Sequence, residues 1–131
     1  MRDLINIFSK LKELLKKHSS GLDLREAVSD SQVKQKKEQF HLYGNKIISI
    51  LGRKPQCTYV AGIIMQKHFV GFYSMPMYSH PHKIKLKNPD LIKMRKGKSC
   101  INMKKLDSAM LRELDEHVKQ GIALYKKEGW I

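Results

Sequence analysis

Apolar residues recur at helical spacing near the start of the chain, and the pattern predicts an amphipathic helix over residues 2–17. The apolar stripe consists of Leu4, Phe8, Leu11 and Leu15, widened by Ile5 and Leu14. The sequence Ser19-Ser20-Gly21 is a helix stop. Residues 22–38 fit either a short strand or a helical turn, and the polar segment from Gln32 to Glu38 is expected to be exposed.

Between about Gln39 and Met75 the apolar period changes to two, which is typical of strands. We expect one strand pair joined near Gly44-Asn45, a turn at residues 52–55, and a hairpin of residues 57–65 and 69–75 closed by Lys67-His68. This register places on one face Ala61, Ile63, Met65, Val70 and Phe72. It places on the other face Val60, Gly62, Ile64, Phe69, Gly71, Tyr73 and Met75. Two glycines on one face indicate close approach of another group, and a packed helix is favoured over a ligand.

The last third of the chain predicts a loop over residues 76–81, a short helix, a short strand and a long helix. Asn88 is a helix cap followed by a proline, and Gly97 is expected to end that helix. A strand is predicted over residues 99–103 and a helix from Asp107 onward. The stripe of the last helix consists of Leu111, Leu114, Val118, Ile122 and Tyr125. The order of elements indicates an α+β fold, an antiparallel sheet with N- and C-terminal helices packed on it.

The length of 131 residues suits a single domain over residues 1–131, large enough to fold without disulfides or structural metals. No apolar run approaches the ~18 residues needed to span a bilayer, and charged residues interrupt the first segment, so we expect no membrane span, no signal peptide and a cytoplasmic protein. The two cysteines are expected to be reduced, with Cys57 buried in a strand and Cys100 at most partly exposed.

The formal net charge of +14 favours an anionic partner. The segment from Lys83 to Lys105 holds nine basic residues and one acid, Asp90. Within it, the candidate anion-binding residues are Lys93, Arg95, Lys96 and Lys98. We expect weak binding to nucleic acid or a phosphorylated ligand, with little sequence preference, because few aromatic residues interleave with these lysines.

Other motifs give weaker indications of chemistry. Gly97-Lys98-Ser99 lacks the earlier glycine of a phosphate-binding loop, because Ile92 occupies that position. His80-Pro81-His82 lacks a third ligand at a telling spacing, so no metal site and no cofactor are predicted. Cys100 follows Lys98, whose charge would favour a thiolate nucleophile, although a structural cysteine is the favoured reading. A candidate pocket consists of Tyr73, Met75, Tyr78, Ser99 and Cys100.

Two stretches carry a resemblance to a known family. They are the segment HFVGFYSMPMY over residues 68–78 and the C-terminal part from Pro89, including GKSC at 97–100 and the ending GIALYKKEGW. In order and spacing these segments resemble the YdhG-like family of small domains. The resemblance implies a small α+β fold with an antiparallel sheet, and a frataxin-like role as an iron chaperone.

Three functional hypotheses follow from these observations. The first is a non-enzymatic intracellular binding module with a basic, anion-binding face. The second is the iron chaperone that the resemblance implies, although iron prefers oxygen ligands and the twelve acidic residues are scattered. The third is an enzyme with a pocket near Tyr78 and Cys100.

Overall fold

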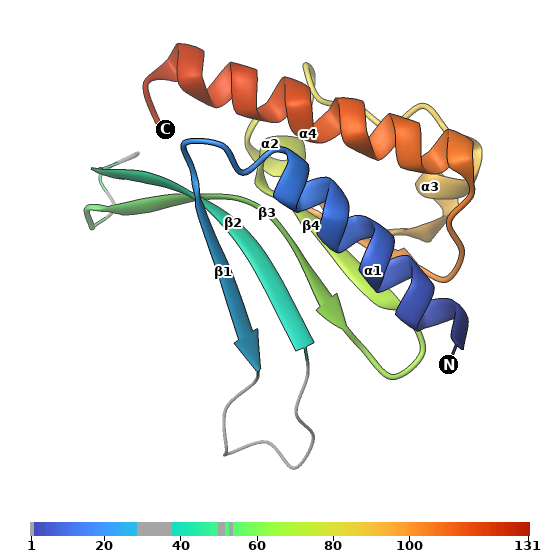
Figure 1. Cartoon of the computed structure of the whole chain (residues 1–131). Coiled ribbons are helices and arrows are strands. Elements are labelled where there is room, and N and C mark those ends of the chain that lie inside the picture. Colours follow the sequence, from blue (N-terminus) through green and yellow to red (C-terminus); the bar gives the residue numbers. More distant parts are fainter. Residues whose placement is uncertain (1, 29–37, 50–51, 53) are drawn as a thin grey trace.

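The fold is α+β, a six-stranded antiparallel sheet with four helices in the part of the chain described here (Figure 1). The computed structural model describes residues 2–28, 38–49, 52 and 54–131. In chain order the elements are α1 (Arg2–Lys17), β1 (Asp23–Val28), β2 (Glu38–Ile48), β3 (Gln56–Met65), β4 (Val70–Ser74), α2 (Met75–Ser79), α3 (Pro89–Met94), β5 (Arg95–Lys96), β6 (Cys100–Met103) and α4 (Ser108–Glu128). The strand order is β1-β2-β3-β4-β6-β5.

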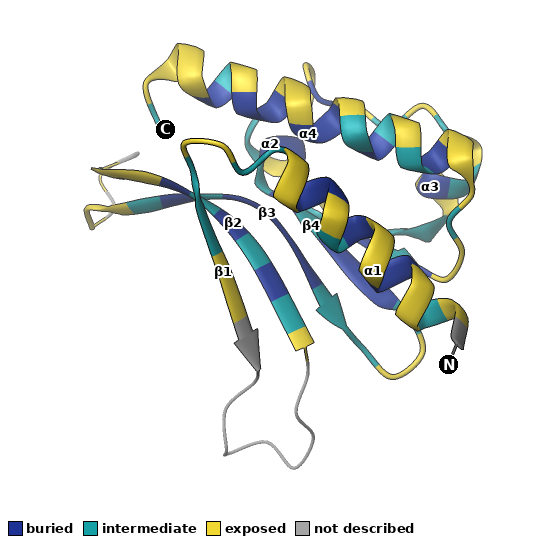
Figure 2. Ribbon diagram, viewed as in Figure 1, coloured by how far each residue is buried: buried dark blue, intermediate teal, exposed yellow. Residues whose placement is uncertain are grey.

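All four helices lie on one face of this sheet, which we call the covered face (Figure 1). Residues paired across antiparallel strands share a face, so the register defines a row across all six strands. This covered row consists of Glu26, Phe40, Ile63, Phe72, Ile101 and Arg95. Its four central residues are at most 3% exposed, and the buried sides of α1 and α4 close over them (Figure 2). The hydrophobic core therefore lies between the helices and this face.

Helix α1 confirms the prediction for residues 2–17, with one error in its buried stripe. Phe8, Leu11 and Leu15 are buried as expected. Ile5 is instead 61% exposed, and Ile7 is buried at 4%. Because each helical residue advances about 100°, the stripe drifts toward Ile7 and Leu14 and away from Ile5.

Helix α4 begins as predicted at Asp107, whose Oδ1 accepts a hydrogen bond from Met110 N at 2.8 Å. It ends at Gly129, which has a φ of 78° and so takes the left-handed conformation of a C-cap. Of its predicted stripe, four residues are buried and Leu111 is half-buried. The short helix α3 also begins as predicted, since the Asn88 side chain accepts from Asp90 N at 2.9 Å.

The hairpin of β3 and β4 has the predicted register, with Ile63 opposite Phe72 and Gln66 N bonded to Phe69 O at 2.9 Å. The prediction for Val60 is wrong. The pairing passes from Leu42 with Ala61 to Tyr43 with Tyr59, so Val60 is an extra residue in β3, a β-bulge. The bulge turns Val60 into the core, where it is 1% exposed.

Three further expectations are corrected. Gly44-Asn45 is not a hairpin turn, because β2 runs through it with a shift of register. A Cβ on Gly44 would collide with the side chain of Ile131, so this glycine admits the C-terminal residue. Gly97 does not end α3, which stops at Met94; it forms the turn between β5 and β6 with a φ of 71°. Within the predicted loop over residues 76–81, residues 76–79 belong to helix α2, which begins at Met75 and is capped by the Ser74 side chain.

Residues 23–28, which fitted a strand or a helical turn, form strand β1. The prediction for the polar segment Gln32–Glu38 lies outside the described residues except at Glu38, which is exposed in β2. In the described ranges, no helix combines the length and the apolar character needed to cross a membrane.

Candidate functional site

The second face of the sheet, on which no described helix packs, is called here the open face (Figure 1). The register defines a second complete row across it. This open-face row consists of Arg25, His41, Gly62, Tyr73, Cys100 and Lys96. Exposed cations therefore stand at both ends of the row, and an aromatic ring lies between them.

The two glycines of the open face lie under aromatic rings of the sheet itself. A Cβ on Gly71 would lie 2.9 Å from the Tyr73 ring, so that ring lies across Gly71. A Cβ on Gly62 would collide with the Tyr59 hydroxyl and with His41. The expected helix over these glycines is wrong, since the helices lie on the covered face. The glycines are needed because each lets a ring lie against the backbone.

Tyr59 belongs to the open face because of the bulge at Val60. Strict alternation would put Tyr59 with Ala61 on the covered face, but the extra residue reverses its direction. Its hydroxyl lies 2.9 Å from His41 Nδ1, and its ring meets Tyr43 edge-on at a centroid distance of 5.2 Å. Burial raises the pKa of Tyr59 and lowers the pKa of His41, so both side chains are neutral near pH 7.

The charge on the open face is mostly positive. The guanidinium of Arg25 lies 4.1 Å from the centroid of the Tyr43 ring, a cation–π contact. Arg25 Nε also donates to Asp23 Oδ2 at 2.8 Å. Asp23 is the only described acid whose register places it on this face, and Arg25 neutralises it.

A hollow of 290 Å³ opens beside Tyr73. It is lined by His41, Tyr59, Ile64, Tyr73, Ser74, Met75 and Ser99. Of the pocket predicted from sequence, it contains Tyr73, Met75 and Ser99. Tyr78 lines a different cavity, and Cys100 lines neither of them.

The four predicted anion-binding residues lie along one edge of the sheet, but their contacts differ. Arg95 Nε and Nη2 donate to the carbonyls of Gly97 and Lys98, both at 3.0 Å, so Arg95 closes the β5–β6 turn. Lys96 is exposed on the open face, opposite Cys100. Lys93 and Lys98 are exposed at the end of α3 and in the turn. Three of the four side chains are therefore available to an anion.

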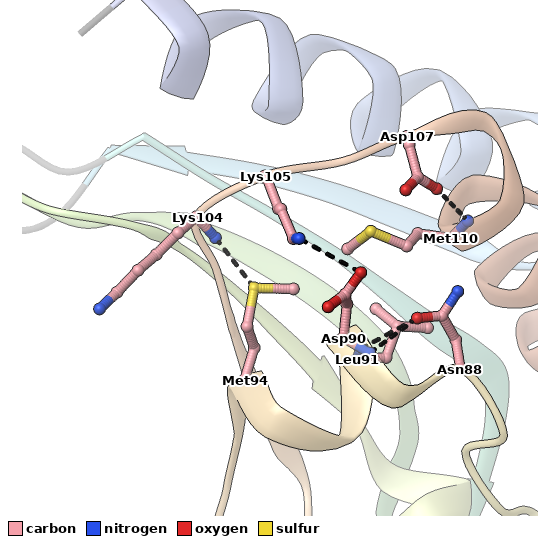
Figure 3. A network of polar contacts seen from close by, with 8 residues as sticks. All are labelled: Asn88, Asp90, Leu91, Met94, Lys104, Lys105, Asp107 and Met110. Atoms are coloured by element: carbon pink, nitrogen blue, oxygen red, sulfur yellow. Dashed lines mark hydrogen bonds and ion pairs between the residues drawn. The ribbon is translucent and has the colours of Figure 1, made fainter.

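The same basic segment also contains contacts that fix its backbone (Figure 3). Lys105 Nζ lies 3.2 Å from Asp90 Oδ2, and Lys104 N donates to the Met94 sulfur at 3.4 Å. These contacts tie the chain after β6 to α3, next to the caps at Asn88 and Asp107 (Figure 3). Part of the positive charge in residues 83–105 thus stabilises the fold.

The surroundings of Cys100 do not activate a thiolate. Its Sγ donates to Asn102 Oδ1 at 3.4 Å, and burial is the largest effect on its pKa, which is raised. Cys57 was predicted to be buried but is half-buried. It lies near the start of β3, where it lines a cavity. Within the described ranges, no three His, Cys, Asp or Glu side chains are grouped to hold a metal ion.

The predicted histidine pair is also separated. His82 is exposed, whereas the His80 side chain is only 15% exposed, with its ring 5.4 Å from that of Trp130. His80 therefore packs in the fold instead of facing solvent beside His82.

No family model, curated protein or solved structure matches this chain. The resemblance to the YdhG-like family, its iron role and the enzyme hypothesis therefore stay predictions. Sequence reasoning did not single out Arg25, His41 or Tyr59 as site residues. These three residues come from β1, β2 and β3, and they can be assigned to one face only once the strand order and register are known.

Proposed function

We propose that the protein binds single-stranded nucleic acid on the open face of its sheet. The observation that supports this most is the open-face row, with the Tyr73 ring across Gly71 and a cation at each end. The five inter-strand steps of about 4.8 Å put Arg25 and Lys96 about 24 Å apart. A strand of nucleic acid lying along this row would meet a ring in its middle, the guanidinium of the Arg25–Asp23 pair at one end and the exposed ammonium of Lys96 at the other.

Stacking explains why the partner is a single strand. The Tyr73 ring lies across Gly71 and is partly exposed, and an unpaired base can stack on an accessible ring face. Burial raises the pKa of Tyr73, so the ring carries no charge that would repel phosphate. In a duplex the bases are already stacked on one another, so only their edges and the backbone can be contacted, and no base face is available to the Tyr73 ring. The hollow beside Tyr73 gives a stacked base room at its edge.

Charge supports the same partner. The net charge of +14 attracts any polyanion, and Lys93, Lys96 and Lys98 extend the positive surface along the sheet edge. An acidic protein would be attracted by the same charge, but it has no bases to stack on the partly exposed ring between the cations. The dependence on Tyr73 therefore separates the two partners.

The test is fluorescence anisotropy with labelled oligonucleotides of about 12 nucleotides, single-stranded and duplex. We expect the single strand to bind at least about tenfold more tightly than the duplex, and Tyr73→Leu to remove most of that difference, because one stacked base contributes about 1–3 kcal/mol. Leucine keeps an apolar cover over Gly71. Tyr78→Leu is the control, since Tyr78 is 50% exposed but lies off the open face. Equal binding of both forms, or equal loss in the two variants, would contradict the proposal.

A further inference from the structure

A second cavity, of 340 Å³, lies where β2 and β3 meet α2 and the end of α4. Aromatic residues are the largest group among its twelve described lining residues. Four of the five tyrosines and the only tryptophan of the chain line it: Tyr43, Tyr59, Tyr78, Tyr125 and Trp130. The volume is at the lower end of the range for ligand pockets, about 300–1,000 Å³.

Contacts within the fold hold these walls in place. The rings of Tyr125 and Trp130 are 5.0 Å apart between centroids, and Trp130 N donates to Tyr125 O at 2.9 Å. Thr58 Oγ1 donates to Trp130 O at 3.2 Å, which ties the chain after α4 to strand β3. A flat ligand would therefore enter a cavity whose rings are already positioned, so little ordering would oppose binding.

The deep end of the cavity offers hydrogen-bond acceptors. The Tyr125 hydroxyl lies 2.6 Å from Ser79 Oγ, which lies 2.8 Å from His80 Nδ1. The two hydroxyls can each donate or accept, so this chain of contacts can run in either direction. In both directions the Tyr125 oxygen keeps at least one lone pair available to a donor on a ligand.

The mouth of the cavity carries the opposite chemistry. Lys54 is the only charged side chain among the described lining residues, and it is exposed, whereas Tyr125 is fully buried. A ligand that filled the cavity would thus meet acceptors at its inner end and an ammonium group at its outer end.

The geometry points to a binding site for a planar aromatic acid that carries a hydroxyl or amino group, a site that borders the open face at Tyr43 and Tyr59 but does not include Tyr73. The aromatic walls contact the ring, the Tyr125 oxygen accepts from the hydroxyl or amino group, and Lys54 pairs with the carboxylate. Neither the net charge nor the open-face row is used in this inference.

Calorimetric titration of the full chain with hydroxynaphthoate, naphthoate and naphthol tests each contact. Hydroxynaphthoate has both groups, naphthoate lacks the hydroxyl and naphthol lacks the charge. We expect hydroxynaphthoate to bind at one site and the other two to bind about fivefold more weakly or worse. Lys54→Met should weaken the two acids but not naphthol. The matched control is Lys67→Met, at an exposed lysine in the β3–β4 turn.

Cys57 supplies a second readout, because it lines the cavity and Cys100 does not. In a Cys100→Ser background, hydroxynaphthoate should slow thiol labelling of Cys57 in proportion to its occupancy. The proposal is overturned if no heat is measured up to about 1 mM probe, if Lys54→Met and Lys67→Met behave alike, or if saturating probe leaves Cys57 labelling unchanged. Circular dichroism of each variant confirms that it is folded.

Discussion

The Ser74 hydroxyl lies 2.6 Å from Nε2 of His117, and both side chains are buried where β4 meets α4. Ser74 Oγ also accepts from Met77 N as the cap of α2, so its own proton is free to donate to His117. Nε2 is then an acceptor and the ring is neutral. One buried hydrogen bond thus joins the end of a central strand, the start of α2 and the middle of α4.

This pair makes the stability depend on pH. Burial, with a smaller effect of Arg95, lowers the pKa of His117 to about 4 from its ordinary 6.5, against the opposing effect of Glu113. Since the unfolded chain binds the proton first, stability is full above about pH 6.5 and falls as the pH drops toward about 4. We expect a loss of roughly 3 kcal/mol at most over this window.

Urea unfolding of the wild type and His117→Gln, at pH values between about 7 and 4, measures this effect. The variant should be less stable than the wild type near pH 7 but lose less stability on acidification. Parallel losses in the two proteins would show that other groups control the acid transition.

Gly121 in α4 faces the ring of Pro76 in α2. A Cβ at Gly121 would lie 2.6 Å from Pro76 Cγ, and a proline ring cannot rotate away. Alanine would improve helix propensity by about 1 kcal/mol, but overpacking of a core contact costs about 1–3 kcal/mol. We therefore expect Gly121→Ala to lower the free energy of unfolding. As a control, Ala123→Gly on the exposed side of α4 should lower it by about 1 kcal/mol through propensity alone. A higher free energy of unfolding for Gly121→Ala would mean that α2 moves away from α4 at no cost in free energy.

Binding of single strands should weaken steeply with salt. Each neutralised phosphate contributes about −0.7 to the slope of log affinity against log salt for a single strand. With about 4 contacts, affinity should fall by about 50-fold between about 50 and 200 mM salt. Lys96→Gln should reduce this slope by about 0.7, whereas Lys119→Gln, at an exposed lysine of α4 on the helical side, should leave it unchanged. If the two variants lose equal affinity, only the overall charge matters.

The thiol of Cys100 should react slowly. Burial raises its pKa above the ordinary value of 9.0, against a smaller opposing effect of Tyr73. In a Cys57→Ser variant, the rate of alkylation at Cys100 should still be rising with pH at about pH 9. A plateau near neutral pH would instead indicate an activated thiolate and would revive the enzyme hypothesis.

The sequence predicted the long elements well because their periodicity is strong. Helix α4 begins at Asp107 and ends at Gly129, and the β3–β4 hairpin has its predicted register. The errors are local irregularities. Nothing in the sequence around Val60 distinguishes a bulge from an ordinary strand, because its effect depends on the pairing with β2. Gly44 resembled a turn residue, but its role is to admit Ile131, which is distant in the chain.

The candidate site was harder to predict because its parts come from distant segments. Lys96 was identified within a basic segment poor in aromatic residues, which argued against base stacking. The strand order places β4 between β3 and β6, so Tyr73 lies on the same row as Lys96. Gly62 and Gly71 correctly indicated close approach, although side chains of the sheet itself, and not a helix, approach them.

The two borders of the sheet bear on how the molecule avoids aggregation. At one border β5 has only two residues, and at the other three of the six residues of β1 are charged: Asp23, Arg25 and Glu26. A short or charged border is a poor template for another extended chain. A sheet with one uncovered aromatic face would otherwise invite edge-to-edge growth into fibrils. We therefore expect the open face to stay exposed at high protein concentration without edge-to-edge growth.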